Sequence, residues 1–89
     1  MKCVVYVLGK DKTGIVAAVA NVMAKNKANI GDISQTLLDD LFCMTMLVSL
    51  DPETAGFNEV QEQLDAVGQE MGLQITIQRQ DVFDFMYSV

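Results

Sequence analysis

The sequence predicts an α+β domain in which a four-stranded antiparallel sheet carries two helices on one of its faces. Two segments have apolar residues at helical spacing, and the stretches around them have the Val-rich or alternating patterns of strands. Only Asp39 and Asp40 separate the second strand pattern from the third, which indicates a hairpin. Because the chain has 89 residues and half of them are apolar, it is long enough for one domain with one core.

The first two elements are predicted within residues 2–27. Lys2–Leu8, which is rich in Val, is predicted to be a strand. A helix is predicted from Thr13 to about Lys27, with Thr13 as its N-cap and Gly14 in its first turn. The helical spacing comes from five apolar residues with alanines between them, namely Ile15, Val16, Val19, Val22 and Met23.

The middle of the chain is predicted to form the hairpin and a second helix. Asn29–Leu38 is the second strand and Leu41–Leu50 is the third. The segment from Asp51 to Thr54 contains the only proline of the chain and is predicted to break the sheet. Gly72 is the predicted C′ residue of the helix that follows. One face of that helix is apolar and consists of Phe57, Val60, Leu64, Val67 and Met71.

The last strand is predicted at Leu73–Arg79, where apolar and polar residues alternate, so that one of its faces is buried. Asp81 is the predicted cap of a short final helix. We therefore divide the chain into a domain of residues 1–80 and a C-terminal helical extension of residues 81–89. The extension is predicted to have an apolar stripe made of Val82, Phe83, Phe85, Met86 and Val89.

The order βαββαβ predicts a ferredoxin-like sandwich, in which the first and third strands are central. Cys3 and Cys43 then lie at opposite ends of neighbouring strands, which excludes a disulfide between them. By alternation along the strands, Cys3 faces the helices and Cys43 faces the open side. The open face is predicted to be too apolar for a monomer and to meet a partner subunit or the C-terminal helix. Its apolar residues are Val4, Tyr6, Leu8, Cys43 and Leu47.

Composition argues against several classes of function. The net charge is −6 and Arg79 is the only arginine, which argues against nucleic-acid binding. The chain lacks histidine, the usual general base and the commonest zinc ligand, so we expect neither an enzyme nor a metal site, and no cofactor. The apolar run Leu41–Leu50 is too short to span a bilayer, and no signal-peptide pattern precedes the first strand. We therefore expect a cytoplasmic protein that does not bind membranes.

The loop between the first strand and the first helix is the strongest functional feature. Gly9 and Gly14 bracket it, and the backbone N–H groups at the helix start point at whatever occupies it. The spacing G-x-x-x-x-G is that of a phosphate-binding loop, but Ile15 and Val16 stand where such a loop needs Lys and Ser or Thr. We therefore expect a small anionic or zwitterionic ligand that is held by main-chain groups.

These features resemble the ACT domain, a small ligand-binding module attached to many enzymes of amino-acid metabolism. The family pattern has G-x-D-x-x-G-I at the helix start and A-N-I at the second strand, matched here by Gly9, Asp11, Gly14 and Ile15 and by Ala28-Asn29-Ile30. Many members have proline where this chain has Thr13, so its loop is expected to be more flexible.

The next residues point to a subgroup of that family. The continuation Asp32-Ile33-Ser34-Gln35 is similar to the N-terminal ACT domains of formyltetrahydrofolate deformylases and to glycine-cleavage regulators. The likeness is strongest to small stand-alone ACT proteins of about this length, which also end in an apolar helix.

The resemblance implies a ligand site at a subunit interface. The expected length of the first helix also requires a second copy to complete the site. A helix of about 14 residues is roughly 21 Å long, so the glycine loop and Asn29 lie at its opposite ends and cannot touch one small ligand within a single chain. In a two-fold dimer with antiparallel first helices, the loop of one subunit lies beside Asn29 of the other. Asp32 and Gln35 are further candidates on the same strand.

The remaining contacts with the ligand are assigned to the loop between the first strand and the first helix. The N–H groups near Thr13, Gly14 and Ile15 are expected to bind a carboxylate, helped by the helix dipole. Asp11 is expected to accept a hydrogen bond from the ammonium group of an amino acid. A ligand that touches both subunits would tighten the dimer, which gives the protein a way to signal.

Simpler interpretations stay open for each residue. Gly9 and Gly14 can serve a tight turn alone, Asp11 can be a solvated carboxylate, and Asn29 can cap the first helix or adopt left-handed geometry. Two functions therefore remain. One is a regulatory protein that binds an amino acid or related carboxylate and acts on a metabolic enzyme or regulator. The other is a dimerising protein-interaction module with a vestigial ligand site.

Overall fold

The computed structural model describes residues 1–87, with side chains up to residue 85. Strands and helices follow the predicted βαββαβ order, and one helix is added at the end. Their bounds are β1 Lys2–Lys10, α1 Ile15–Lys25, β2 Asn29–Leu38, β3 Leu41–Ser49, α2 Phe57–Met71, β4 Leu73–Arg79 and α3 Gln80–Tyr87.

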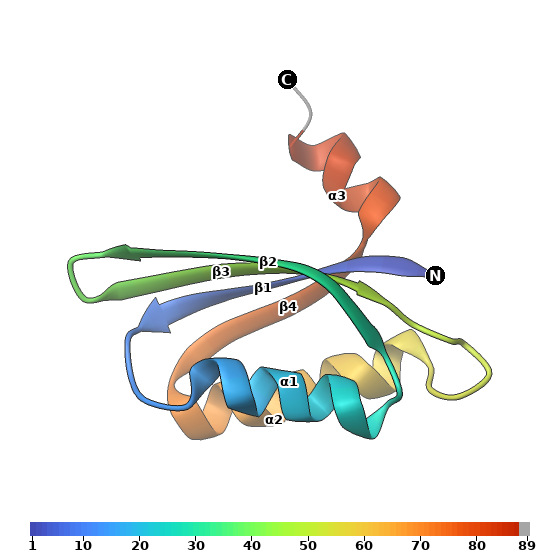
Figure 1. Ribbon diagram of the computed structural model, residues 1–89, viewed down its shortest axis with the longest axis horizontal. Helices are drawn as coiled ribbons and strands as arrows, with labels where there is room; N and C mark the ends of the chain where they lie inside the picture. Colours follow the sequence, from blue (N-terminus) through green and yellow to red (C-terminus); the bar gives the residue numbers. More distant parts are fainter. Residues whose placement is uncertain (88–89) are drawn as a thin grey trace.

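The strands form one antiparallel sheet in the order β2-β3-β1-β4, so β1 and β3 are central as predicted. Helices α1 and α2 lie side by side against one face of the sheet, and α3 rises from the other face (Figure 1). This confirms the ferredoxin-like sandwich with a short C-terminal helix. None of the helices within residues 1–87 is both long and apolar enough to cross a membrane.

The core lies between the sheet and the two helices. Cys3, Val5 and Val7 of β1 face it, which confirms the predicted side for Cys3. Cys43 lies on the other face of the sheet, and both cysteines are free. In the register, Cys3 pairs with Val48 and Cys43 with Leu8, so the two thiols are at opposite ends of the β1–β3 pair, as predicted.

The start of α1 differs from the prediction. Thr13 is not its N-cap and Gly14 is not in its first turn, because Gly14 itself is the N-cap, in left-handed geometry with φ 90°. A residue without a Cβ adopts this conformation at little steric cost, so the backbone conformation of glycine decides where the helix begins.

The end of α1 also differs. The helix ends at Lys25 with Asn26 as its C-cap, two residues before the predicted end. Lys27 then takes the left-handed conformation, with φ 55°. Asn29 neither caps α1 nor has left-handed geometry, because it is the first residue of β2. That simpler interpretation of Asn29 is therefore wrong.

The second half of the sandwich follows the prediction closely. Helix α2 ends at Met71, and the φ of 70° at Gly72 confirms this glycine as the left-handed residue that stops the helix. Strand β4 buries Leu73, Ile75 and Ile77 and leaves the residues between them more exposed.

The C-terminal helix covers one end of the open sheet face. It begins at Gln80, so Asp81 lies inside its first turn, where its carboxylate accepts a 2.9 Å hydrogen bond from the N–H of Val82. Phe83 packs on Tyr6, with ring centroids 6.1 Å apart. Val4 is only 1% exposed, because α3 contacts β1 and β4 on this side, which confirms the C-terminal helix as one of the two predicted covers of the open face.

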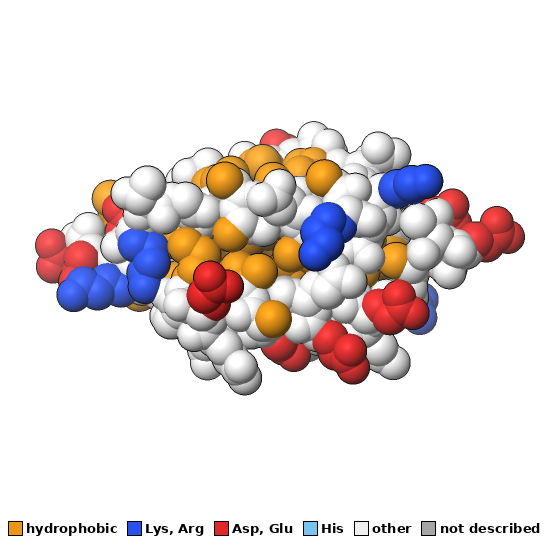
Figure 2. All heavy atoms as spheres, turned by 90° about the horizontal axis from the view of Figure 1, so that it is seen from below, with side chains coloured by type: hydrophobic (Ala, Val, Ile, Leu, Met, Phe, Trp, Pro, Cys, Tyr) orange, Lys and Arg blue, Asp and Glu red, His pale blue; other side chains and the backbone are white. Residues whose placement is uncertain are grey.

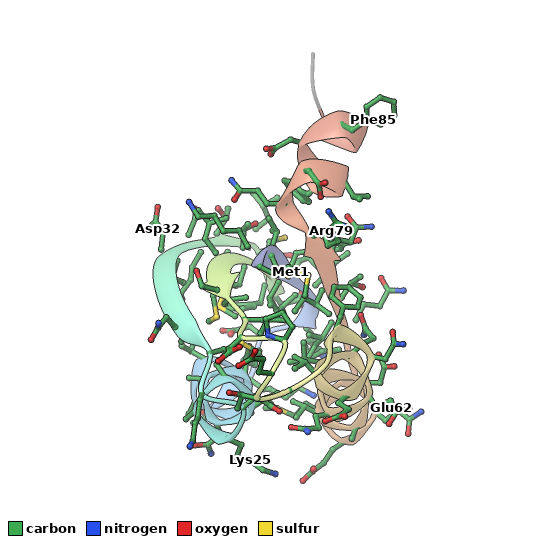
Figure 3. The ribbon with its side chains drawn as sticks, turned by 90° about the vertical axis from the view of Figure 1, so that its right-hand side faces the viewer. Met1, Lys25, Asp32, Glu62, Arg79 and Phe85 are labelled. Carbon is green, nitrogen blue, oxygen red and sulfur yellow. The ribbon has the colours of Figure 1, made fainter. Side chains whose placement is uncertain are left out.

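The predicted apolar stripe on α3 does not lie on one buried face. Phe83 is half-buried, whereas Phe85 is 86% exposed and Val82 is also exposed. Figure 3 shows Phe85 far from the sheet, near the end of the helix. Of the other predicted stripe residues, the side chain of Met86 and the whole of Val89 lie outside the described part of the chain.

Candidate functional site

The loop between β1 and α1 leads into a helix N-terminus without a side-chain cap. Gly14 has no side chain to offer, and within the described residues no other side chain accepts from the first turn. The first N–H groups of a helix have no intrahelical acceptor, and they carry the positive end of the helix dipole. This end of α1 can therefore bind an anion through its backbone. Ile15 can contribute only its N–H, because its side chain is buried in the core.

Two contacts anchor the loop to the rest of the molecule. The N–H of Asp11 donates a 2.8 Å hydrogen bond to the carbonyl of Asp40, in the turn between β2 and β3. The Lys12 ammonium donates to the carbonyl of Met71, at the last turn of α2, where the helix dipole favours a positive charge. The side chains of Asp11 and Thr13 remain exposed between these anchors.

Gly9 has a packing role of its own. A Cβ at this position would lie 2.5 Å from Cδ2 of Leu73, whose side chain would have to move, and 3.2 Å from its Cα, where the two strands would have to give slightly. A hollow at this end of β4 is lined by Leu8, Gly9, Gly72 and Leu73, among others, and Gly9 is the only predicted site residue among them. The requirement for glycine here follows from strand packing, whether or not a ligand binds.

The three predicted residues of β2 are exposed but do not share one face. Asn29 lies opposite Ser49 and Asp32 opposite Leu47, on the open face, whereas Gln35 lies opposite Met44, on the helix face. A β-bulge between Ile30 and Asp32 causes this, because one extra residue reverses the alternation. The Asp32 carboxylate also accepts a 2.9 Å hydrogen bond from the next N–H in the strand.

The predicted site residues fall into two groups within one chain. The loop group is at the start of α1, and Asn29 lies past the other end of this helix, which has 11 residues and so rises by about 16 Å. Asp32 lies at the outer edge of the sheet, on the opposite side of the molecule from Glu62 of α2 (Figure 3). A single copy therefore does not bring the loop and Asn29 together.

Cys3 does not add a reactive group to this region. Burial raises the pKa of the Cys3 thiol, against smaller opposing effects of the N-terminal ammonium and of Arg79. A neutral thiol packed in the core serves as an apolar side chain and not as a nucleophile.

Three polar residues with structural roles were missed by sequence analysis. Asn26 is 6% exposed, and its amide donates to the carbonyl of Val22 at 2.7 Å and to the side chain of Gln63 at 2.8 Å. Lys12 caps α2, and Gln61 contacts the backbone of β4. For Asn26 the only signal is its place at the end of the apolar helical pattern, and for Lys12 and Gln61 the sequence carries none.

Comparison with known proteins identifies the family of this fold. Residues 2–78 match the ACT domain family. A UPF0237 protein of Methanocaldococcus jannaschii is 43% identical over 88 residues, which cover 99% of this chain and 98% of that protein. The ACT domain protein from Streptococcus pneumoniae is 43% identical, with a TM-score of 0.80 and 94% of each chain covered.

Two longer proteins contain the same fold as one part of their chain. A putative glycine cleavage system transcriptional repressor is 25% identical with a TM-score of 0.78, and the match covers 89% of this chain and 45% of that one. A formyltetrahydrofolate deformylase from Burkholderia mallei is 12% identical with a TM-score of 0.78, over 88% of this chain and 28% of that one, and this likeness concerns the fold alone.

Proposed function

Because the chain belongs to the ACT domain family, we propose that it is a regulatory protein that binds a small carboxylate, such as an amino acid, between two copies of itself. The observation that carries the proposal is the N-terminus of α1, where Gly14 leaves the first turn without a side-chain cap. A carboxylate is the natural occupant, since it accepts from several N–H groups and is attracted by the helix dipole.

The loop supplies the remaining contacts on one side of the ligand. The side chain of Asp11 is exposed, while its backbone is fixed by the bond to Asp40, so its carboxylate is available to an ammonium group. Thr13 is exposed beside it. A carboxylate and an ammonium bound at adjacent points would select an α-amino acid over a simple anion.

The second copy supplies the other side. Asn29 is too far from the loop of its own chain, and an amide at this position can bind either charged group of an amino acid. We assign Asn29 of the partner subunit to the site, and treat Asp32 and Gln35 as weaker candidates because they face opposite sides of the sheet.

Regulation follows from the sharing of the site. A ligand that binds only the paired form shifts the equilibrium toward that form. The dimer would then act on a metabolic enzyme or regulator in the cytoplasm, a location in keeping with two free cysteines.

The shared site can be tested by complementation. We expect one or a few of the twenty amino acids to bind the wild type in a calorimetric titration. Asp11→Ala and Asn29→Ala should each weaken that binding at least tenfold. An equal mixture of the two variants should recover binding at about a quarter of the wild-type stoichiometry, because about half of the dimers are mixed and one of the two sites in each mixed dimer keeps both residues. Asp84→Ala, an exposed carboxylate on α3, is the matched control and should bind normally.

A second function is favoured by specific contacts. The Lys12 anchor and the close packing at Gly9 account for much of the loop without any ligand. In a dimerising interaction module with a vestigial site, these two contacts alone would explain the conformation of the loop. Failure of all twenty amino acids to bind a stable dimer would favour this module and contradict the sensing function.

A further inference from the structure

We propose that the hollow at the start of β4 is a second ligand site, present within each copy of the chain, and that it binds a small organic amine with an apolar chain. This site goes beyond the proposed function, because it needs neither a second copy nor the N-terminus of α1. The inference comes from the open floor of the hollow, its apolar wall and its charge.

The hollow follows the outer edge of β4. The second half of α2 lines one side of it, and Leu8 and Leu41, from the open face of the sheet, line the other. Its volume is about 940 Å³, which is within the range of pockets that hold small molecules. The hollow therefore has room for a ligand that touches both the helix and the open face.

Glycines keep the floor of the hollow free of side chains. A Cβ on Gly68 would lie 2.6 Å from the carbonyl oxygen of Leu73, and one on Gly9 would lie 2.5 Å from Cδ2 of the same residue. Gly72, which also lines the hollow, has the left-handed conformation that favours glycine. Packing and backbone geometry therefore exclude side chains from these three places, and the space along β4 stays open.

A small molecule fits this edge better than a peptide strand. Gln61 of α2 accepts a 3.1 Å hydrogen bond from the N–H of Ile77, and its amide lies 3.4 Å from the carbonyl of Ile75. An incoming strand would need these backbone groups for its own hydrogen bonds. A ligand that binds through side chains of the hollow does not need them.

Leu8 and Leu41 give the hollow an apolar wall. They are 40% and 39% exposed, and Tyr6, the next residue of β1 on this face, is half-buried. Helix α3 rises over the other end of the sheet and leaves this end uncovered (Figure 1). An alkyl chain placed against these side chains would remove apolar surface from water, which favours binding.

Asp65 supplies the charge of the site. It is the only charged residue among those that line the hollow. Its Oδ1 accepts a 2.7 Å hydrogen bond from the amide of Gln61, which orients the carboxylate, so that Oδ2 can accept from a ligand. Glu62 and Glu70 are exposed on the same helix, and acidic side chains gather over α2 when the molecule is viewed from the helix side (Figure 2). The local potential therefore favours an ammonium group over a carboxylate.

Uncharged polar groups complete the site. Gln69 and Thr76 line the hollow and can accept from the remaining N–H groups of an ammonium. The Lys12 ammonium lies near Gly72, but it donates to a backbone carbonyl at the end of α2. Gly72 follows Asp65 by about two helical turns, which is about 10 Å along the axis, so Lys12 does not neutralise this carboxylate.

An NMR titration of the isotope-labelled chain with n-octylammonium chloride tests the site. We expect saturable shifts of the backbone amides of Gly68, Gln69 and Ile75. The affinity should be roughly millimolar, because Asp65 is exposed and an exposed ion pair contributes little. Octanoate has the same chain with the opposite charge, and methylammonium has the same charge without the chain. Neither should give saturable shifts at these amides.

Three variants test the two parts of the site. Asp65→Asn removes the charge and keeps an acceptor for Gln61, and it should weaken octylammonium binding about two- to fivefold. Leu41→Ser removes part of the apolar wall and should weaken it at least about twofold. Glu62→Gln is the matched control, an exposed carboxylate of the same helix that does not line the hollow, and it should bind like the wild type.

Circular dichroism checks that the variants fold, as expected because all three positions are exposed. Absence of saturable shifts, equal binding of octanoate, or an Asp65→Asn variant that binds no more weakly than Glu62→Gln would each overturn the proposal. Amino-acid binding at the start of α1 uses none of the residues changed here, so failure of this site is distinguishable from failure of the proposed function.

Discussion

The two outer strands of the sheet, β4 and β2, meet their surroundings in different ways. At β4, the Gln61 side chain bonds the outward N–H of Ile77 and lies near the carbonyl of Ile75, with α2 packed closely alongside. At β2, all ten residues are exposed, and among the described residues no side chain from another element bonds its backbone, although the Asp32 carboxylate accepts from the N–H of Ile33 within the strand. One edge is closed within the chain, and the other is open.

The contrast shows which edge of the sheet is accessible to another strand. An exposed edge strand invites pairing with another chain, and proteins protect such edges with charges, bulges or covering elements. Here the bulge lies at one end of β2, and Asp32, at the start of the regular stretch Asp32–Leu38, bonds the N–H of Ile33. The rest of that stretch is exposed and has no covering element, in contrast to β4.

The largest expected effect tests how tightly β4 is covered. Gly68→Ala places a Cβ 2.6 Å from a backbone oxygen, which does not move as a side chain can, so α2 must shift away from β4. We expect a loss of about 1–3 kcal/mol in the free energy of unfolding, measured by urea denaturation.

Gly31→Ala is the matched change at the open edge. Its Cβ would meet the carbonyl oxygen of Leu47 at 3.7 Å, an ordinary contact, so the stability should change by less than about 0.5 kcal/mol. Equal losses in the two variants would mean that β4 is no more tightly covered than β2.

A smaller effect tests the side chain that closes the β4 edge. Gln61→Ala leaves the outward N–H of Ile77 without its acceptor and should cost about 1–2 kcal/mol. It should also allow new, weak association at high protein concentration through the opened edge. Unfolding curves and light scattering measure the two effects.

The control for Gln61 is Gln69→Ala, an exposed glutamine on the same helix. It should change neither stability nor association appreciably. If Gln61→Ala behaves like this control, the β4 edge is closed by some other feature, and the contrast between the two edges loses its physical basis.

The architecture could be predicted because it depends on apolar periodicity and on a few turn residues. The bounds of β2, α2 and β4 match the prediction, and the left-handed Gly72 ends α2 as expected. The two-residue turn at Asp39 and Asp40 predicted the β2–β3 hairpin, and the register confirms it. These features are local, so short stretches of sequence suffice to specify them.

The details that failed depend on contacts between distant residues. The anchor from Lys12 to Met71 and the contact of Gln61 with β4 join residues that no local pattern relates. The helix cap failed for another reason, since Thr13 was predicted from its side chain, whereas the left-handed backbone of Gly14 places the cap one residue later. For the site, the glycine loop could be found from sequence, but the reversal of faces at the β2 bulge could not.

Hydrogen exchange of individual backbone amides, followed by NMR at several protein concentrations, tests the central claim most directly. The outward amides of Gln35 and Leu37 should exchange fast in dilute solution and become protected as the concentration rises, whereas the amide of Ile33 already donates to the Asp32 carboxylate. The amide of Ile77, which Gln61 covers, should be protected throughout. Exchange of the β2 amides that does not change with concentration, or fast exchange at Ile77, would contradict the account of one open and one closed edge.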